Sequence, residues 1–310
     1  MAEQVESHIH DLALTYLGSN GIPTLSSGFP ILDRALDGGF VPGSIYVLGG
    51  FPGSGKTSFA LSIARRMAFE GKRRVLYVSL EMSATELLER ALCQFTRQTV
   101  HQLRELRSQH HLNDAAEPFV TCCKQSSFKI EDVLGDTTTD LQVLIEGSGS
   151  ADEHPPEVLI IDHLQHQLFT EGLSRADALA NYMADLKKLA KRHRLVILAC
   201  SQFNRVSRNE KKAQLWHLKS SGAIEEVSDC VLLCDKANLD TLDLKTQQEP
   251  TEFTVRVAKH RRGPLSEFTL IFTPAHYEFE EPASTWQPTR KVVAEDVLVI
   301  EEEKDAHVQP

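Results

Sequence analysis

A glycine-rich stretch directly after an apolar run is the feature that most constrains the fold of this chain. The apolar residues 45–48 precede the pattern Gly50-x-x-x-x-Gly55-Lys56-Thr57. Glycines let a backbone wrap around phosphate oxygens with its N–H groups pointing inward, and a helix that starts there adds its positive amino-terminal end. At average residue usage the pattern occurs by chance in only about one of a hundred chains of this length. It therefore predicts a strand, a loop that binds a nucleoside triphosphate, and a helix.

The residues of this loop have expected roles. Lys56 would reach the β- and γ-phosphates and Thr57 would hold Mg²⁺, so the implied ligands are ATP and Mg²⁺. A glycine-rich turn that binds nothing is the alternative, and the strand–loop–helix context argues against it. The residues expected to bind the nucleotide are Gly50, Phe51, Pro52, Gly53, Ser54, Gly55, Lys56, Thr57 and Ser58.

Polar side chains stand just beyond three further apolar runs, at Glu81, Asp162 and Gln202. The carboxyl ends of parallel strands meet at the edge of a sheet where ligands bind. Beside a phosphate-binding loop, Glu81 would orient and deprotonate the attacking water, with a helix-capping role as an equal alternative. Asp162 would hold the water shell of Mg²⁺. Gln202 would sense the γ-phosphate, or it is an ordinary surface residue.

Strand-like and helical patterns alternate along the chain. Strand-like runs are expected at residues 44–48, 75–80, 158–161, 196–199 and 231–233. Helical patterns, which separate the first four runs, lie at residues 57–69, 84–97 and 176–192. This alternation predicts an α/β fold in which helices cover both faces of a mostly parallel, twisted sheet. A late β-hairpin is predicted at residues 253–258 and 267–272.

The formal net charge of −10 argues against a nucleic-acid partner, but the charge is unevenly distributed. Residues 276–310 contain nine Asp or Glu and three Lys or Arg. Residues 204–219 contain five Lys or Arg and one Glu, which gives a local charge of +4. Recognition of a polyanion depends on the local field more than on the total charge. Binding of a nucleic acid near residues 204–219 therefore stays open.

Several other features favour a cytoplasmic protein without membrane contact. The chain has no apolar run long enough to cross a bilayer, and its acidic, polar amino terminus is unlike a secretory signal. The six cysteines have neither zinc-ligand spacing nor the density of a disulfide scaffold. His163 and His166 lack an acid or a cysteine at metal-ligand spacing, so they are interpreted as structural.

Seven short stretches form an ordered set across residues 23–281. They are SGFPILD (27–33), GSGKT (53–57), SLEMS (79–83), IDHLQ (161–165), SQFNR (201–205), SGAIE (221–225) and KHRRGP (259–264). In order and spacing they resemble the carboxy-terminal motor domain of the DnaB-type replicative helicases, which are ring ATPases with a RecA-like core. The SLEMS and KHRRGP stretches are the specific part, because many ATPases share the phosphate-binding loop.

The resemblance implies a catalytic set. Lys56 binds phosphate, Glu81 is the catalytic carboxylate and Gln202 is the phosphate sensor. Lys259 and Arg261 match the finger residues that reach from one subunit into the nucleotide of its neighbour, where a cation neutralises transition-state charge. A solvated basic loop is the alternative for this turn. Head-to-tail contacts that close generate rings, so a homohexamer is expected.

Residues 204–219 and the turn after them align with the loops that line the family's central channel. Those loops hold single-stranded DNA by its backbone. The turn departs from the family, because Lys219-Ser-Ser-Gly222 replaces Arg-Glu-Ser-Gly and lysine lacks the bidentate fork of arginine. Trp216 either stacks on a base or anchors the loop to the core. The residues implied to contact DNA are Arg205, Arg208, Lys211, Lys212, Lys219 and Gly222.

The expected organisation is a motor domain at residues 22–281 between two short segments. Residues 282–310 would form an acidic, flexible tail. Residues 1–21 would form a linker-type helix that packs on its own core or docks on a neighbouring subunit. This helix or the tail could also bind a replication protein. The family usually carries a helical domain before the motor, where this chain has about 20 residues. One face of the expected helix is formed by Val5, Ile9, Leu12 and Tyr16.

The leading hypothesis is an ATP-dependent DNA helicase or translocase of the DnaB type that acts on single-stranded DNA in replication. One alternative is a DnaB-like ATPase without unwinding activity that remodels or loads a protein partner. Another is a recombination ATPase of the RecA or RadA type, which SLEMS and KHRRGP fit less well. A nucleotide-binding scaffold without activity is disfavoured, because Lys56, Thr57, Glu81 and Asp162 are all present.

Overall fold

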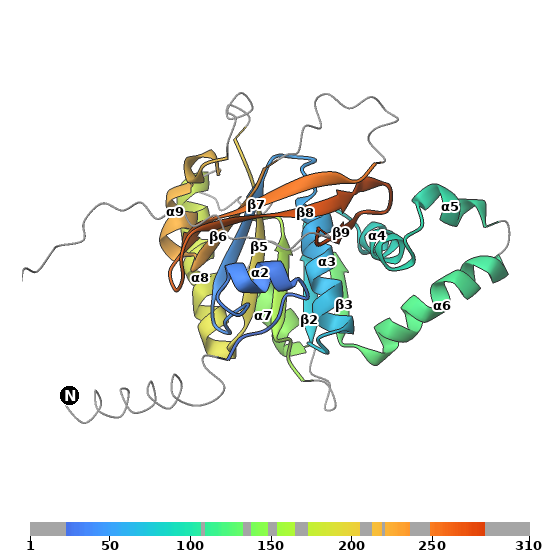
Figure 1. Cartoon of the computed structure of the whole chain (residues 1–310). Helices are drawn as coiled ribbons and strands as arrows, with labels where there is room; N and C mark the ends of the chain where they lie inside the picture. Colours follow the sequence, from blue (N-terminus) through green and yellow to red (C-terminus); the bar gives the residue numbers. More distant parts are fainter. Residues whose placement is uncertain are drawn as a thin grey trace, which may run out of the picture.

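The computed structural model describes residues 23–106, 109–132, 138–147, 154–164, 173–204, 213–218, 221–235 and 249–282. Within these residues a nine-stranded sheet runs through the molecule in the order β3-β2-β4-β5-β1-β6-β7-β8-β9 (Figure 1). The strands are β1 Ile45–Gly50, β2 Val75–Ser79, β3 Phe128–Asp132, β4 Val158–Asp162, β5 Val196–Gln202, β6 Cys230–Asp235, β7 Thr251–His260, β8 Ser266–Thr273 and β9 Glu278–Glu280.

The sheet has a parallel part and an antiparallel part. The strands from β3 to β6 pair in parallel, whereas β7, β8 and β9 continue the sheet in antiparallel. Strand β1 is central, and all its residues are buried. Its last residue, Gly50, lies opposite Gln202 at the end of β5. The carboxyl ends of the parallel strands therefore meet at the same edge of the sheet as the glycine-rich loop.

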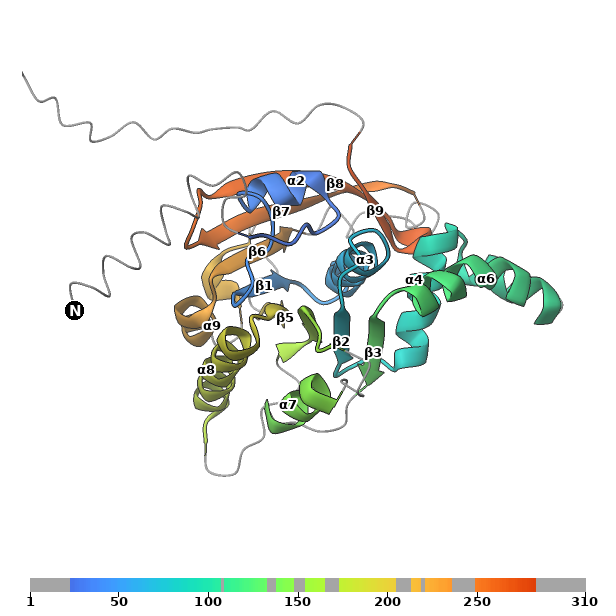
Figure 2. The ribbon, with the colours of Figure 1, turned by 90° about the horizontal axis from the view of Figure 1, so that it is seen from below.

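Helices cover both faces of the parallel sheet, as predicted. Tyr46 of β1 packs in one apolar cluster with Phe59 of α3, whereas Val47 packs in the other cluster with Met183 of α8. This alternation follows from the two-residue period of a strand. Figure 2 shows α3 on one side of the sheet and α7 and α8 on the other. The helices are α2 Pro30–Ala35, α3 Lys56–Phe69, α4 Ala84–Thr96, α5 Val100–Glu105, α6 Gln109–Gln125, α7 Thr138–Gly147, α8 Arg175–His193 and α9 Ser221–Val227.

The strands and helices predicted between residues 44 and 272 are present, and most are longer than expected. The predicted hairpin is formed by β7 and β8. The helices α2, α5, α6, α7 and α9 and the strands β3 and β9 were not predicted from the sequence. Strand β3 lies at the edge of the sheet with partly exposed residues, so it lacks the apolar run of a central strand. The predicted segment 1–21 lies outside the described residues, and so does the predicted tail 282–310 except for Pro282.

Two further predictions concern the cysteines and the membrane. All six cysteines are free, and Cys93, Cys200, Cys230 and Cys234 are buried. Among the described residues, no helix combines the length and the apolar character needed to cross a membrane.

A buried ion-pair cluster fixes β9 against α3. The carboxylate of Glu278 accepts hydrogen bonds from Arg65 at 2.9 Å and from Arg66 at 2.8 Å, and its side chain is only 4% exposed. Arg66 also donates to the carbonyl of Phe279. These contacts hold β9 against α3, and the 3-10 helix η6, Pro274–His276, which directly precedes Tyr277 and β9, contacts α4.

Candidate nucleotide-binding site

The glycine-rich loop turns between the end of β1 and the start of α3. Gly53 and Gly55 have φ angles of 72° and 94°, in the left-handed region that favours glycine. Gly50 is required for a different reason, since a Cβ there would lie 2.8 Å from the hydroxyl of Ser54. The loop therefore ends at Gly55, the cap of α3, with the first backbone N–H groups of a 14-residue helix directed at the loop.

Lys56 lies under the loop rather than in solvent. Its ammonium group donates a hydrogen bond of 2.7 Å to the carbonyl of Phe51, and the residue is 6% exposed. Burial lowers the pKa of Lys56, and the negative charges of nearby groups, including Asp162 and Glu81, oppose that shift. A cation held in this way is placed for phosphate oxygens before any ligand arrives.

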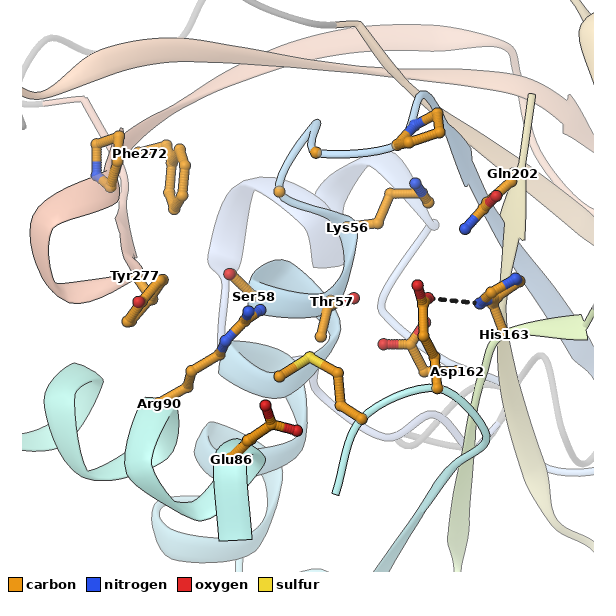
Figure 3. Close-up of a pocket in the computed structure, with 16 residues that line it drawn as sticks. Lys56, Thr57, Ser58, Glu86, Arg90, Asp162, His163, Gln202, Phe272 and Tyr277 are labelled. Atoms are coloured by element: carbon orange, nitrogen blue, oxygen red, sulfur yellow. Dashed lines mark ion pairs between the residues drawn. The ribbon is translucent and has the colours of Figure 1, made fainter. Parts of the chain in front are cut away.

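Residues from the ends of several strands line one cavity of about 610 Å³ (Figure 3). Of the residues predicted to bind nucleotide or to act in catalysis, the cavity brings together Pro52, Gly53, Gly55, Lys56, Thr57, Ser58, Glu81, Asp162 and Gln202. Gly50, Phe51 and Ser54 shape the loop from behind and are not among the residues that line the cavity. Phe51 packs edge-on against Phe203, with ring centroids 4.9 Å apart.

Asp162 and Thr57 supply oxygen atoms to the same part of the cavity. One carboxylate oxygen of Asp162 accepts a hydrogen bond of 2.8 Å from the hydroxyl of buried Tyr77, which orients the carboxylate. Burial and the charge of Asp162 raise the pKa of Tyr77, so this hydroxyl stays a donor. Oxygen donors are the ligands that Mg²⁺ prefers, and it commonly takes its others from phosphates and water. The residues present therefore fit Mg²⁺. The described residues contain no group of three or more His, Cys, Asp or Glu that could hold a metal ion without the nucleotide.

His163, interpreted from the sequence as a structural residue, also lines the cavity. Its Nδ1 atom lies 3.0 Å from Oε2 of Glu81, and the dashed line at His163 in Figure 3 marks this contact. The imidazole is 8% exposed and the Glu81 side chain is 56% exposed. The peptide bond between Asp162 and His163 is cis. A buried imidazole thus contacts the carboxylate that is expected to activate water. His166 lies outside the described residues.

Arg90, Phe272 and Tyr277 lie in the part of the cavity away from Lys56 (Figure 3). The guanidinium carbon of Arg90, from α4, lies 5.1 Å from the ring centroid of Tyr277, and Met82 and Pro274 also line the cavity. A cation over an aromatic ring beside apolar groups suits a planar base. Sequence reasoning missed these residues, because Tyr277 is remote from the loop and has no pattern of its own.

Lys259 and Arg261 do not reach the cavity of their own chain. The ammonium group of Lys259 donates hydrogen bonds to the carbonyls of Glu225 and Ser228, at the end of α9. Arg261 donates to the carbonyl of Glu226, and its guanidinium lies 3.6 Å from a carboxylate oxygen of Asp229. The two cations therefore cap α9, and a catalytic role would require a neighbouring subunit.

The residues implied to contact DNA are mostly outside the described residues. These are Arg205, Arg208, Lys211, Lys212 and Lys219. Gly222 lies in the first turn of α9, and a Cβ there would meet nothing within 4 Å. Trp216 is 62% exposed, so it does not anchor the loop to the core. Its buried neighbour His217 has that role.

The fold and the site together define a RecA-like protein with a phosphate-binding loop. Two solved structures share this fold at 23% sequence identity. One of them, an ATPase domain, matches with a TM-score of 0.75 over 91% of this chain and 99% of that one. The other, a DnaB-like replicative helicase described with its interactions with primase, matches with a TM-score of 0.76 over 89% of this chain and 66% of that one.

The family model of the DnaB-like helicase C-terminal domain matches residues 24–281, and the chain belongs to this family. It is 26% identical over 277 residues to the replicative DNA helicase DnaB of Pasteurella multocida. It is 28% identical over 249 residues to a probable plasmid replicative DNA helicase of Chlamydia psittaci. These matches cover 86% and 79% of this chain. The chain spans 57% and 53% of the length of these relatives, about half of each.

Proposed function

We propose that this chain hydrolyses ATP and couples the hydrolysis to movement along single-stranded DNA, as the motor domain of a DnaB-type helicase. The hydrolytic part rests on one observation: Lys56 at the start of α3 lines the same cavity as Glu81, Asp162 and Gln202, which come from the ends of different strands. Membership of the DnaB-like family supports the DNA part.

The proposed reaction assigns a task to each side chain. Lys56 binds the β- and γ-phosphates, and the end of α3 presents N–H groups to them. Thr57 and Asp162 hold Mg²⁺, which when bound neutralises charge on the phosphates. Glu81 orients the attacking water and accepts its proton, and Gln202 contacts the γ-phosphate. Arg90 and Tyr277 hold the base at the other end of the cavity.

A second subunit completes the proposed site. Lys259 and Arg261 would reach the γ-phosphate of the neighbouring chain, which links hydrolysis to contact between subunits. A head-to-tail arrangement that closes would give the homohexameric ring. In that ring the basic residues of 204–219 and the turn before α9 would face the DNA, and a replication protein would bind outside the motor.

The experiment that tests this proposal is ATP hydrolysis with and without single-stranded DNA, together with strand separation on a forked duplex. Stimulation by DNA and unwinding of the fork are the expected results. Hydrolysis that DNA does not change, but that a protein partner raises, would favour the remodelling alternative. Formation of joint molecules from homologous strands would favour the recombination alternative.

A further inference from the structure

A second hollow, of about 810 Å³, lies between the 3-10 helix η3, Leu215–His217, and the hairpin of β7 and β8. Trp216 and Leu265 line it and are 62% and 65% exposed. Among the described residues, Val143 is the only other large apolar side chain exposed to this extent. Two large apolar groups thus line one hollow.

Hydrogen bonds and packing of the neighbouring residue His217 hold the backbone at Trp216. The carbonyl of the next residue, His217, accepts a hydrogen bond of 2.7 Å from the N–H of Asn204. The Nδ1 atom of His217 accepts one of 3.0 Å from the N–H of Gln214, and the imidazole is buried against Phe203. The indole lies edge-on to this imidazole, with ring centroids 5.5 Å apart. The contacts of His217 thus hold the backbone beside Trp216, and most of the indole is exposed to solvent.

The backbone at Trp216 is joined to the nucleotide site. Phe203 follows Gln202 directly, and it forms a β-bridge with Leu218. The Phe203 ring also packs against Phe51 of the glycine-rich loop. Ring contacts through His217 and Phe203 therefore link Trp216 to the end of the strand that carries Gln202.

The charged residues around the hollow favour an uncharged ligand group. Arg256 is neutralised by ion pairs with Asp235 and with Glu267, at 2.5 and 3.2 Å. The hollow is also lined by Glu225, so it has no surplus positive charge for a phosphate. The amino-acid sequence around Trp216 is basic, because residues 204–219 contain five Lys or Arg and one Glu. A hollow without surplus positive charge, formed in part by a residue of this basic stretch, matches a single strand, whose phosphates are charged and whose bases are flat and neutral.

We propose that Trp216 stacks on a base of single-stranded DNA, with Leu265 on the opposite side of the hollow. This inference rests on the proposed function. It adds a contact with a DNA base to the contacts proposed with the DNA backbone. Aromatic side chains bind bases in this way with little regard to sequence, since every base has a π-face. A stacked base would thus contact a side chain that is linked, through His217 and Phe203, to the strand that ends at Gln202.

Tryptophan fluorescence tests the contact directly, because the chain has two tryptophans, Trp216 and Trp286. The full chain carrying Trp286→Phe leaves Trp216 as the only indole. It is titrated with oligothymidylate and with an abasic oligonucleotide of the same length. We expect quenching and protection from acrylamide with oligothymidylate, and little change with the abasic strand.

Binding by anisotropy provides the second measurement. Trp216→Ala is expected to weaken binding of oligothymidylate about tenfold and to leave the abasic strand unchanged. Trp216→Phe keeps a ring and should recover most of the loss. Val143→Ala, which removes a similarly exposed apolar group from α7, serves as the matched control.

The outcomes separate this inference from the proposed function. Tight binding of both oligonucleotides without quenching of Trp216 would overturn the stacking contact. The same holds if Trp216→Ala lowers the affinity for both oligonucleotides equally. Neither result would contradict the proposal that the chain moves along DNA. Failure of the parent chain to bind either oligonucleotide at low salt would overturn both. Shielding of Trp216 that depends on protein concentration and not on DNA would show an interface between copies instead, and it would also overturn stacking.

Discussion

The Nδ1 atom of His163 lies 3.0 Å from Oε2 of Glu81. The two residues follow different strands, β4 and β2, which pair in parallel so that Ser79 lies opposite Asp162. The imidazole is buried, whereas more than half of the Glu81 side chain is exposed. The buried imidazole therefore restricts where the Glu81 carboxylate can lie in the cavity, which Lys56 and Asp162 also line.

His163 is expected to position the carboxylate for catalysis. In His163→Ala, kcat for ATP should fall about tenfold or more, since small misplacements of a catalytic group are costly. KM for ATP should change by less than about twofold, because the phosphate contacts are made by other residues. His163→Asn, which can still donate a hydrogen bond, should recover part of kcat. A rise in KM with kcat unchanged would contradict this role.

Glu81→Gln should reduce kcat by at least about a hundredfold, because the amide cannot accept the proton of water. Binding of a fluorescent ATP analogue should be retained. Glu86→Gln is the matched control, because Glu86 lines the same cavity but serves as a cap of α4 through the backbone N–H of Ser83. Glutamine can also form this capping contact, so its activity should stay near that of the parent. Equal losses in both variants would contradict the assignment.

Tyr277→Ala should weaken binding of ATP about fivefold, because the ring and Arg90 together form the base end of the cavity. Competition against inorganic triphosphate is the informative measurement, since that ligand has no base. Its affinity should be unchanged in Tyr277→Ala, and Tyr277→Phe should behave like the parent. If triphosphate affinity falls as far as ATP affinity, the effect lies in the loop and not in base contact.

Lys259→Ala and Arg261→Ala should each lower the assembled ATPase rate by at least about a hundredfold. Mixing either variant with Glu81→Gln subunits should restore part of the activity, because some interfaces then combine an intact Glu81 with an intact finger. Arg262→Ala, at the neighbouring exposed arginine, should have a small effect. Thermal unfolding of each variant checks that α9 keeps its cap. If mixing never restores activity, the two residues do not act across an interface.

Glu278 is expected to be worth much more to stability than its neighbour Glu280. Glu278→Ala leaves Arg65 and Arg66 without their buried carboxylate, which should lower the free energy of unfolding by about 3–5 kcal/mol. Glu280→Ala removes an exposed pair with Arg97 and should cost about 1 kcal/mol or less. Urea unfolding measures both. Similar values for the two variants would contradict the role given to the buried cluster.

The sequence was most informative where one local pattern carries the information. The phosphate-binding loop and the polar residues after buried strands predicted Lys56, Asp162 and Gln202 as members of one site, and the cavity brings them together. The alternation of strands and helices predicted the parallel sheet. Each of these signals lies within a few neighbouring residues, so no long-range contact was needed to detect it.

Other parts of the site depend on contacts between distant segments. The partner of Glu81 is His163, which follows a different strand, and a lone histidine has no pattern that distinguishes a cavity residue from a core residue. Tyr277 reaches the cavity because β9 is tied to α3 through Glu278. The exposure of Trp216 depends on its neighbour His217, whose imidazole takes the buried position.

The central claim is that ATP hydrolysis is coupled to single-stranded DNA, and its most direct test is the ATPase rate with and without that DNA over a salt series. The parent chain should be stimulated, with a stimulation that falls steeply as salt rises. Lys219→Ala should lose most of the stimulation and keep the basal rate. A parent rate that single-stranded DNA leaves unchanged at every salt concentration would contradict the claim.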